Sequence, residues 1–216
     1  MAEIEGVIKY SINHIDKAID PIISLSEINA WRTVLFKLQL IGQQKDRYEG
    51  YGFGNISQRI HTSDTKLDQF LISGTQTGGI AELSSRHYCQ VLNANPNSNQ
   101  LDSQGLYKPS SEALTHASVY LHDNSVQAVI HVHNPEIWNN TARLDLPCTA
   151  ANIAYGTPEM AAEVARLLQS EQLKQKKIFT MLGHIDGVIA YADNMEQAAQ
   201  NIIKYYEKAI ALEQTL

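Results

Sequence analysis

The chain has 216 residues, of which 44% are hydrophobic and 19% are charged, values typical of one globular domain. It has 17 basic and 23 acidic residues, and the resulting net charge of −6 provides no positive field that would attract nucleic acid or anionic lipid. No apolar run approaches the ~20 residues that cross a bilayer, the first residues lack a signal-peptide pattern, and Cys89 and Cys148 are the only cysteines. We therefore expect a cytoplasmic protein with neither nucleic-acid nor membrane partners.

The N-terminal part of the sequence predicts two helices. Isoleucine and valine recur at helical spacing over residues 4–19, which predicts a helix within an N-terminal helical extension, 1–24. Ser24 and Glu27 then form a capping box before an apolar stripe, which predicts a second helix. In this interpretation residues 1–216 form a single domain.

Glycine-rich stretches and short strands follow. The segments at residues 55–60 and 69–73 are typical of strands, and the tight glycine loops beside them expose backbone N–H groups. The polar segment 93–109 has no periodicity. We expect it to be an irregular excursion that is either mobile or shaped by a partner subunit.

The second half of the sequence combines helices with strands. Ser110 and Ser111 predict a serine N-cap, Thr157 before a proline predicts another helix start, and Asp193 or Asn194 caps a long last helix. Strands are predicted at VQAVIHVH, KIFTML and GVIAYA. Together these elements predict helices packed on a mixed sheet.

Two histidines on one face of a predicted strand are the most informative pattern. His131 and His133 lie two residues apart, so a strand points both imidazoles to the same side. Buried strand histidines can simply bond to carbonyls, but such a pair can also hold one ion at the ~2.0 Å distance that zinc requires. A third ligand from the turn GHIDG would leave an open, catalytic type of site. His184 is the candidate, and Asp186 is its rival.

Glu112 and the serines before it occupy a predicted first helical turn. The helix dipole stabilises a carboxylate there by ~0.3–1 kcal/mol, and beside a metal the same group could take a proton from a carbon next to a carbonyl. Ser110 and Ser111 can cap the helix and also bind an anion, because a helix N-terminus with free N–H groups is a ready phosphate site. The loops GFGNIS and GTQTGG could cradle the same phosphate.

In their order along the chain, these motifs resemble the class II aldolase and adducin head-domain family. The resemblance covers roughly residues 25–213 and follows the order GNIS, SGTQTG, KPSSE with His116 and Tyr120, AVIHVH, and LGHIDGVIA. The step from Glu112 to His131 is also similar to the family's spacing. The ordered set is far more specific than any single motif.

The resemblance implies an α/β fold, a three-layer α/β/α sandwich around a mixed, mostly antiparallel sheet, usually assembled as a homotetramer with active sites at subunit boundaries. It implies a divalent metal, usually Zn²⁺, bound by His131, His133 and His184, with Glu112 as the acid/base residue. The positions that match the family's phosphate-binding residues are Asn55, Thr77, Gly78, Ser110 and Ser111.

Two features depart from the family pattern. Only 23 residues separate His133 from Thr157, and the family loop that supplies a tyrosine proton donor has no evident counterpart; Tyr155 is near but does not match that position. In GHIDG, an alignment anchored on the last glycine would place Asp186 at the ligand position. We prefer His184, because an imidazole there completes a three-histidine set.

We therefore predict a divalent-metal-dependent lyase that acts on a small, phosphorylated sugar or hydroxycarbonyl compound through a metal-stabilised enediolate. Aldol cleavage, epimerisation and dehydration all stay open. The alternative is a non-catalytic assembly module similar to the adducin head, which would need no open metal site. A weaker alternative is a metal hydrolase that uses a zinc-bound hydroxide.

Overall fold

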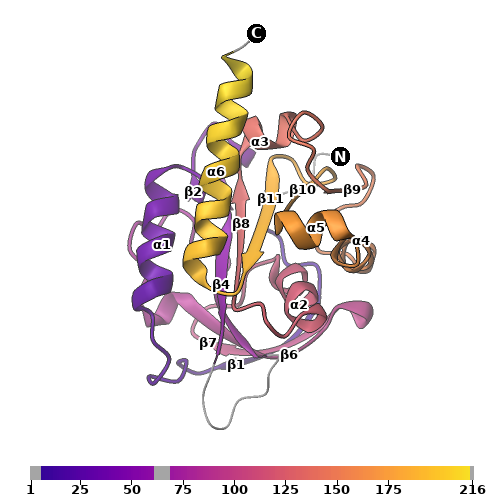
Figure 1. Cartoon of the computed structure of the whole chain (residues 1–216). Helices are drawn as coiled ribbons and strands as arrows, with labels where there is room; N and C mark the ends of the chain where they lie inside the picture. Colours follow the sequence, from indigo (N-terminus) through magenta and orange to yellow (C-terminus); the bar gives the residue numbers. More distant parts are fainter. Residues whose placement is uncertain (1–5, 61–68, 215–216) are drawn as a thin grey trace.

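The structure, a computed structural model, describes residues 6–60 and 69–214 (Figure 1). The strands are β1 (Ser11–Asp16), β2 (Gly42–Gln43), β3 (Gly52–Phe53), β4 (Asn55–Arg59), β5 (Phe70–Ser73), β6 (Tyr88–Asn95), β7 (Gln100–Gly105), β8 (Ala128–His133), β9 (Cys148–Thr149), β10 (Ile178–Met181) and β11 (Gly187–Ala192). The helices are α1 (Ser26–Lys37), α2 (Ala113–His122), α3 (Pro135–Asn139), α4 (Pro158–Leu168), α5 (Glu171–Lys176) and α6 (Met195–Glu213).

Among the described residues, nine strands form one sheet in the order β1-β7-β6-β5-β4-β8-β11-β10-β9, and β2 pairs with β3 separately. The pairs β1–β7 and β9–β10 are parallel, and the other neighbours in the sheet are antiparallel. The predicted mixed, mostly antiparallel sheet is therefore confirmed.

Helices cover both faces of the sheet, because alternate residues of β8 pack against different sets of helices. Ile130 and Val132 belong to a core shared with α1 and α6, whereas Val129 belongs to a second core shared with α2, α4 and α5. Successive strand residues point to opposite faces, so His131 and His133 share the second face with Val129. The layers are helix, sheet and helix, as Figure 1 shows.

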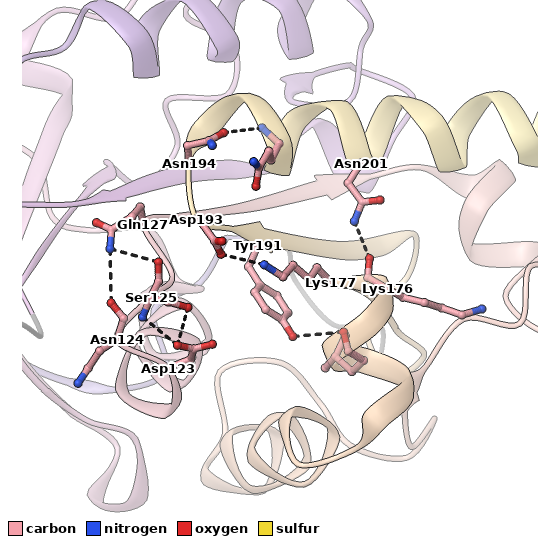
Figure 2. Close-up of polar contacts among 12 residues, drawn as sticks. Asp123, Asn124, Ser125, Gln127, Lys176, Lys177, Tyr191, Asp193, Asn194 and Asn201 are labelled. Carbon is pink, nitrogen blue, oxygen red and sulfur yellow. Dashed lines mark hydrogen bonds and ion pairs between the residues drawn. The ribbon is translucent and has the colours of Figure 1, made fainter.

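The last helix begins at a side-chain cap. Asn194, one of the two predicted caps, accepts a hydrogen bond from a first-turn backbone N–H at 2.8 Å (Figure 2). Lys177 pairs with Asp193 at 2.8 Å, and Asn201 donates to the backbone carbonyl of Lys176 at 2.7 Å. These contacts tie the first part of α6 to the C-terminal end of α5. Within the described ranges, no helix has the length and apolarity needed to cross a bilayer.

The helix predicted over residues 4–19 is wrong in its described part. Residues 11–16 form β1, which pairs in parallel with β7 along its whole length, and no helix occurs between residues 6 and 24. Ile12 packs partly against the second core, whereas Ile15 is exposed. Pairing with a strand distant in sequence overrides the helical spacing, because β structure depends on its neighbours more than on local propensity. Residues 1–5 lie outside the described residues.

The irregular excursion predicted over residues 93–109 is also wrong. Residues 93–95 continue β6, Pro96–Ser98 form a short 3₁₀ turn, and the chain returns as β7. A bulge between Val91 and Asn93 interrupts the register. The buried positions of β7 include a serine and a glycine, and this composition hides the alternation that marks a strand.

Two predicted helix caps differ from the structure. The N-cap of α1 is Leu25, with no side-chain hydrogen bond, instead of the predicted Ser24 box. The N-cap position of α2 is Glu112, also without a side-chain cap, and the Ser110 hydroxyl accepts a bond from the Glu112 N–H at 3.3 Å. Ser110 and Ser111 therefore precede the helix without capping it in the predicted way.

Candidate active site

The structure brings His131, His133 and His184 together at one end of β8. A possible ligand atom from each imidazole lies within 4.8 Å of the others, and the Nε2 atoms of His131 and His133 are 3.1 Å apart. All three side chains are at most 3% exposed. Gly187 of β11 pairs in register with His133, so the turn before β11 lies at the end of β8 and carries His184 to the cluster.

The turn that carries His184 is held by its own backbone. His184 N–H donates to Met181 O at 3.0 Å, and Gly187 N–H donates to His184 O at 2.9 Å. A Cβ on Gly183 would overlap the carbonyl of Ile153, so only glycine fits this close approach. The close approach to Ile153 therefore explains the first glycine of GHIDG.

Asp186, the rival third ligand, points elsewhere. Its carboxylate accepts a hydrogen bond from the Tyr48 hydroxyl at 2.5 Å and lies 3.8 Å from the Arg47 guanidinium. Burial, followed by the charge and hydrogen bond of Asp186, raises the pKa of Tyr48. In the part of the chain that the structure describes, the group close enough to share one ion contains His184 and not Asp186.

Glu112 lies against the third imidazole. Its Oε1 is 3.3 Å from His184 Nδ1, and the side chain is 1% exposed. Burial raises the pKa of Glu112, but His184 and His131 outweigh that effect and hold it below its ordinary value. An ionised carboxylate is thus kept in a dry place beside the three histidines.

The orientation of His131 is set by the neighbouring strand. Its Nδ1 lies 3.3 Å from the backbone oxygen of Val188. If Nδ1 carries the proton of this contact, Nε2 presents a lone pair to the middle of the cluster. Burial, followed by the charges of His184 and His131, lowers the pKa of His133 well below its ordinary value, which favours the neutral imidazole that a metal binds.

A small pocket lies beside the histidine cluster and contains all five residues that the sequence matched to phosphate binding. Its lining consists of Gly6, Gly52, Gly54, Asn55, Gly74, Thr75, Gln76, Thr77, Gly78, Ser110 and Ser111. Asn55 on β4 is the register partner of His131 on β8, and Ser110 is two residues from Glu112. The pocket and the cluster are therefore neighbours.

Arg32, which the sequence analysis did not single out, supports the glycine loop of this pocket. It is 1% exposed and donates to the carbonyls of Thr77 and Gly78 at 3.0 and 2.9 Å. The sequence did contain a sign that Arg32 is buried, because it lies between Ile28 and Leu35 on the apolar face of α1. A charged residue on an apolar helix face needs polar partners, and here they are loop carbonyls.

The sequence also did not predict that two aromatic rings lie against the histidines. Tyr48 meets His133 edge to face at 4.6 Å, and Tyr155 stacks on His184 at 4.5 Å with an interplanar angle of 23°. Tyr48 begins a one-turn 3₁₀ helix that ends at Gly50, and Tyr155 lies in a turn beside Gly156, so no periodicity marks either ring as buried. Nothing in the local sequence indicates these contacts.

His116 and Tyr120, which follow the KPSSE motif on α2, form a buried network with Ser57 of β4. Ser57 Oγ lies 2.7 Å from His116 Nδ1 and 2.8 Å from the Tyr120 hydroxyl. Burial, followed by the charge of His131, lowers the pKa of His116 to about 3. The neutral network fixes α2, and with it Glu112, on the sheet.

Comparisons with known proteins agree with this architecture. Residues 43–212 match the family model of the class II aldolase and adducin N-terminal domain, so the chain belongs to this family. The search of curated proteins found no match.

Solved structures of the family share the fold. L-fuculose-1-phosphate aldolase from Thermus thermophilus superimposes with a TM-score of 0.62 and 20% identity, over 88% of this chain and 92% of that one. A sugar-phosphate aldolase from Thermotoga maritima gives 0.64 and 16%, over 87% and 92%. An aldolase II superfamily protein from Pseudomonas syringae gives 0.58 and 16%, over 91% and 79%. At these identities the similarity establishes the fold alone.

Proposed function

We propose that this protein is a divalent-metal-dependent lyase of the class II aldolase type that acts on a small, phosphorylated sugar or hydroxycarbonyl compound. The observation that carries the proposal is the buried cluster of His131, His133 and His184 with Glu112 against it. Burying three imidazoles and a carboxylate costs desolvation free energy that apolar residues would avoid. A metal-dependent reaction would explain why these three histidines and Glu112 are buried together.

The donor atoms fit a divalent metal. Two nitrogens of a tetrahedral zinc site lie roughly 3.3 Å apart, given metal–nitrogen distances of about 2.0 Å, and the Nε2 atoms of His131 and His133 are 3.1 Å apart. Three protein ligands leave one position for a substrate, as in catalytic zinc sites. A bound zinc ion, or another divalent metal, would supply Lewis-acid polarisation of a substrate carbonyl.

Proton transfer is the role that we assign to Glu112. Its carboxylate lies beside the cluster, excluded from water, where it can accept a proton from a carbon next to a carbonyl group. Aldol cleavage, epimerisation and dehydration all begin with such a transfer or pass near it. Glu112 therefore supports a reaction that begins with proton transfer at carbon, but it does not distinguish among aldol cleavage, epimerisation and dehydration.

We assign the phosphate of the substrate to the pocket that contains Asn55, Thr77, Gly78, Ser110 and Ser111. The start of α2 and the glycine loop can turn backbone N–H groups toward an anion. The names of two structural relatives, L-fuculose-1-phosphate aldolase and sugar-phosphate aldolase, favour a sugar phosphate. We also propose that the protein is cytoplasmic and forms a homotetramer. Analytical ultracentrifugation would measure the oligomeric state.

The test is exchange of carbon-bound hydrogen in deuterated water, followed by NMR on a panel of ketose phosphates and related hydroxycarbonyl compounds. We expect zinc-loaded protein to exchange a proton of at least one compound and chelator-treated protein to lose this activity. Metal-loaded protein that exchanges no proton of any compound would overturn the enzyme proposal. An assembly module similar to the adducin head would then be favoured.

A further inference from the structure

The N-terminal segment, residues 6–10, lies against the candidate site although the family match begins only at residue 43. Gly6 lines the small pocket and accepts a hydrogen bond from the Thr75 hydroxyl at 3.3 Å. Tyr10 is 5% exposed, and its hydroxyl donates to the backbone oxygen of Ser110 at 2.8 Å. The segment thus closes one side of the pocket and contacts the chain that leads into α2.

The middle of the same segment contacts Tyr155. The backbone N–H of Val7 donates to the Tyr155 hydroxyl at 3.2 Å, and Lys9 Nζ donates to the Tyr155 carbonyl at 3.1 Å. Lys9 Nζ also lies 3.7 Å from the centre of the tyrosine ring. The Tyr155 side chain is fully buried.

Tyr155 is therefore held between the N-terminal segment and His184. The imidazole of His184 stacks on the phenol ring at 4.5 Å, and the ammonium of Lys9 also lies over that ring. The ring of Tyr155 is therefore in contact with both groups. His184 comes from a turn, where a side chain has more freedom than on a central strand such as β8.

We infer that residues 6–10 are part of the active site and that Tyr155 is a positioning residue, which fixes the imidazole of His184 for metal binding. The inference rests on the proposed function, because it concerns the same three-histidine cluster. A stacked ring restricts rotation of the imidazole, as the outer partners of metal ligands do in other proteins. Val7 and Lys9 in turn hold the stacked ring in place.

Zinc affinity, measured by competition with a chromophoric chelator, tests the inference. We expect Tyr155→Leu to bind Zn²⁺ about 10- to 100-fold more weakly than wild type, the range found for partners of metal ligands. Tyr155→Phe keeps the stacked ring and should restore most of the affinity. The absorption spectrum of bound Co²⁺, which reports coordination geometry, should change in the leucine variant and not in the phenylalanine variant.

The matched control is Tyr191→Leu. Tyr191 is also a buried tyrosine, but it lies toward the far end of β11 from Gly187, where its side chain points to α5 and its hydroxyl donates to the Leu173 carbonyl at 3.4 Å (Figure 2). Its loss should lower the melting temperature and leave zinc affinity unchanged. If Tyr155→Leu and Tyr191→Leu bind zinc equally well, Tyr155 is only a core residue and the inference is overturned.

NMR of the His184 ring in metal-free protein separates this inference from the proposed function. We expect the ring protons to carry an aromatic ring-current shift that persists in Tyr155→Phe, decreases in Lys9→Met and disappears in Tyr155→Leu. A shift that Tyr155→Leu or Lys9→Met leaves unaltered would overturn the inference even if wild type binds zinc. A wild type that binds no zinc would overturn the proposed function, and the ring shift would still decide whether Tyr155 fixes His184.

Discussion

The histidine cluster and the pocket beside it use their polar side chains differently. In the pocket, the Thr77 hydroxyl donates to Gly74 O at 2.8 Å, and the Ser110 hydroxyl accepts from the Glu112 N–H, so these groups also build the loop. In the cluster, three imidazoles face one another. Variants of the cluster should therefore separate function from stability, whereas variants of the pocket groups that build the loop, Thr77 and Ser110, should affect both.

The largest effect is expected from removing two histidines. Purified wild type should carry about one divalent metal per chain, because three imidazoles share one open site. His131→Ala with His133→Ala should reduce that content to background and retain the circular dichroism of the fold, since a chain of this length has its own core. Elemental analysis measures the metal, and His122→Ala, which alters an exposed histidine, is the control. Metal content equal to wild type in the double variant would refute the ligand assignment.

The next largest effect is expected at Glu112. Glutamine keeps the shape of the side chain but cannot accept a proton, so Glu112→Gln should lose roughly 10²- to 10⁴-fold in turnover. Bound metal and phosphate affinity should be retained. Proton exchange with the best ketose phosphate measures the loss, with Glu163→Gln, which alters a carboxylate paired with Arg166, as the control. Undiminished exchange in Glu112→Gln would remove this residue from the reaction.

Within the pocket, Ser111 and Asn55 should affect phosphate binding more than they affect the stability of the loop. Ser111→Ala with Asn55→Ala should weaken inorganic phosphate binding, because each charge-assisted hydrogen bond contributes roughly 1.5 to 3 kcal/mol. The melting temperature should fall little, because the Asn55 side-chain oxygen is buried without a hydrogen-bond partner among the described residues. Calorimetry measures the affinity, and Ser118→Ala on α2 is the control. Equal affinity in wild type and the double variant would leave these two residues with structural roles only.

The same contrast shows what the sequence can predict. β8 was predictable because its apolar residues alternate with period two, and the ordered motifs placed His131, His133, His184 and Glu112 near one another. β1 was not predictable, since its partner β7 lies about ninety residues away. The contact of Tyr155 with Val7 was not predictable for the same reason, because 148 positions in the sequence separate the two residues. Local patterns predict elements and motif order, but they do not encode contacts between distant loops.

The variant Arg32→Met tests whether the pocket loop can be weakened without any effect on the histidine cluster. Arg32→Met keeps most of the aliphatic stem but removes hydrogen bonds to the carbonyls of Thr77, Gly78 and Ala81. Lost bonds to a charged donor are costly, but the desolvation cost of a buried cation disappears with them, so we expect a net loss of only about 1 to 3 kcal/mol in urea unfolding.

Phosphate affinity of Arg32→Met should fall only several-fold, because the glycine loop loses its support while its N–H groups remain. Zinc content should stay at the wild-type level. Arg166→Met, which alters an exposed arginine paired with Glu163, should change none of these measurements. If Arg32→Met loses zinc as well as phosphate, the pocket and the cluster form one structural unit, and the contrast between them is wrong.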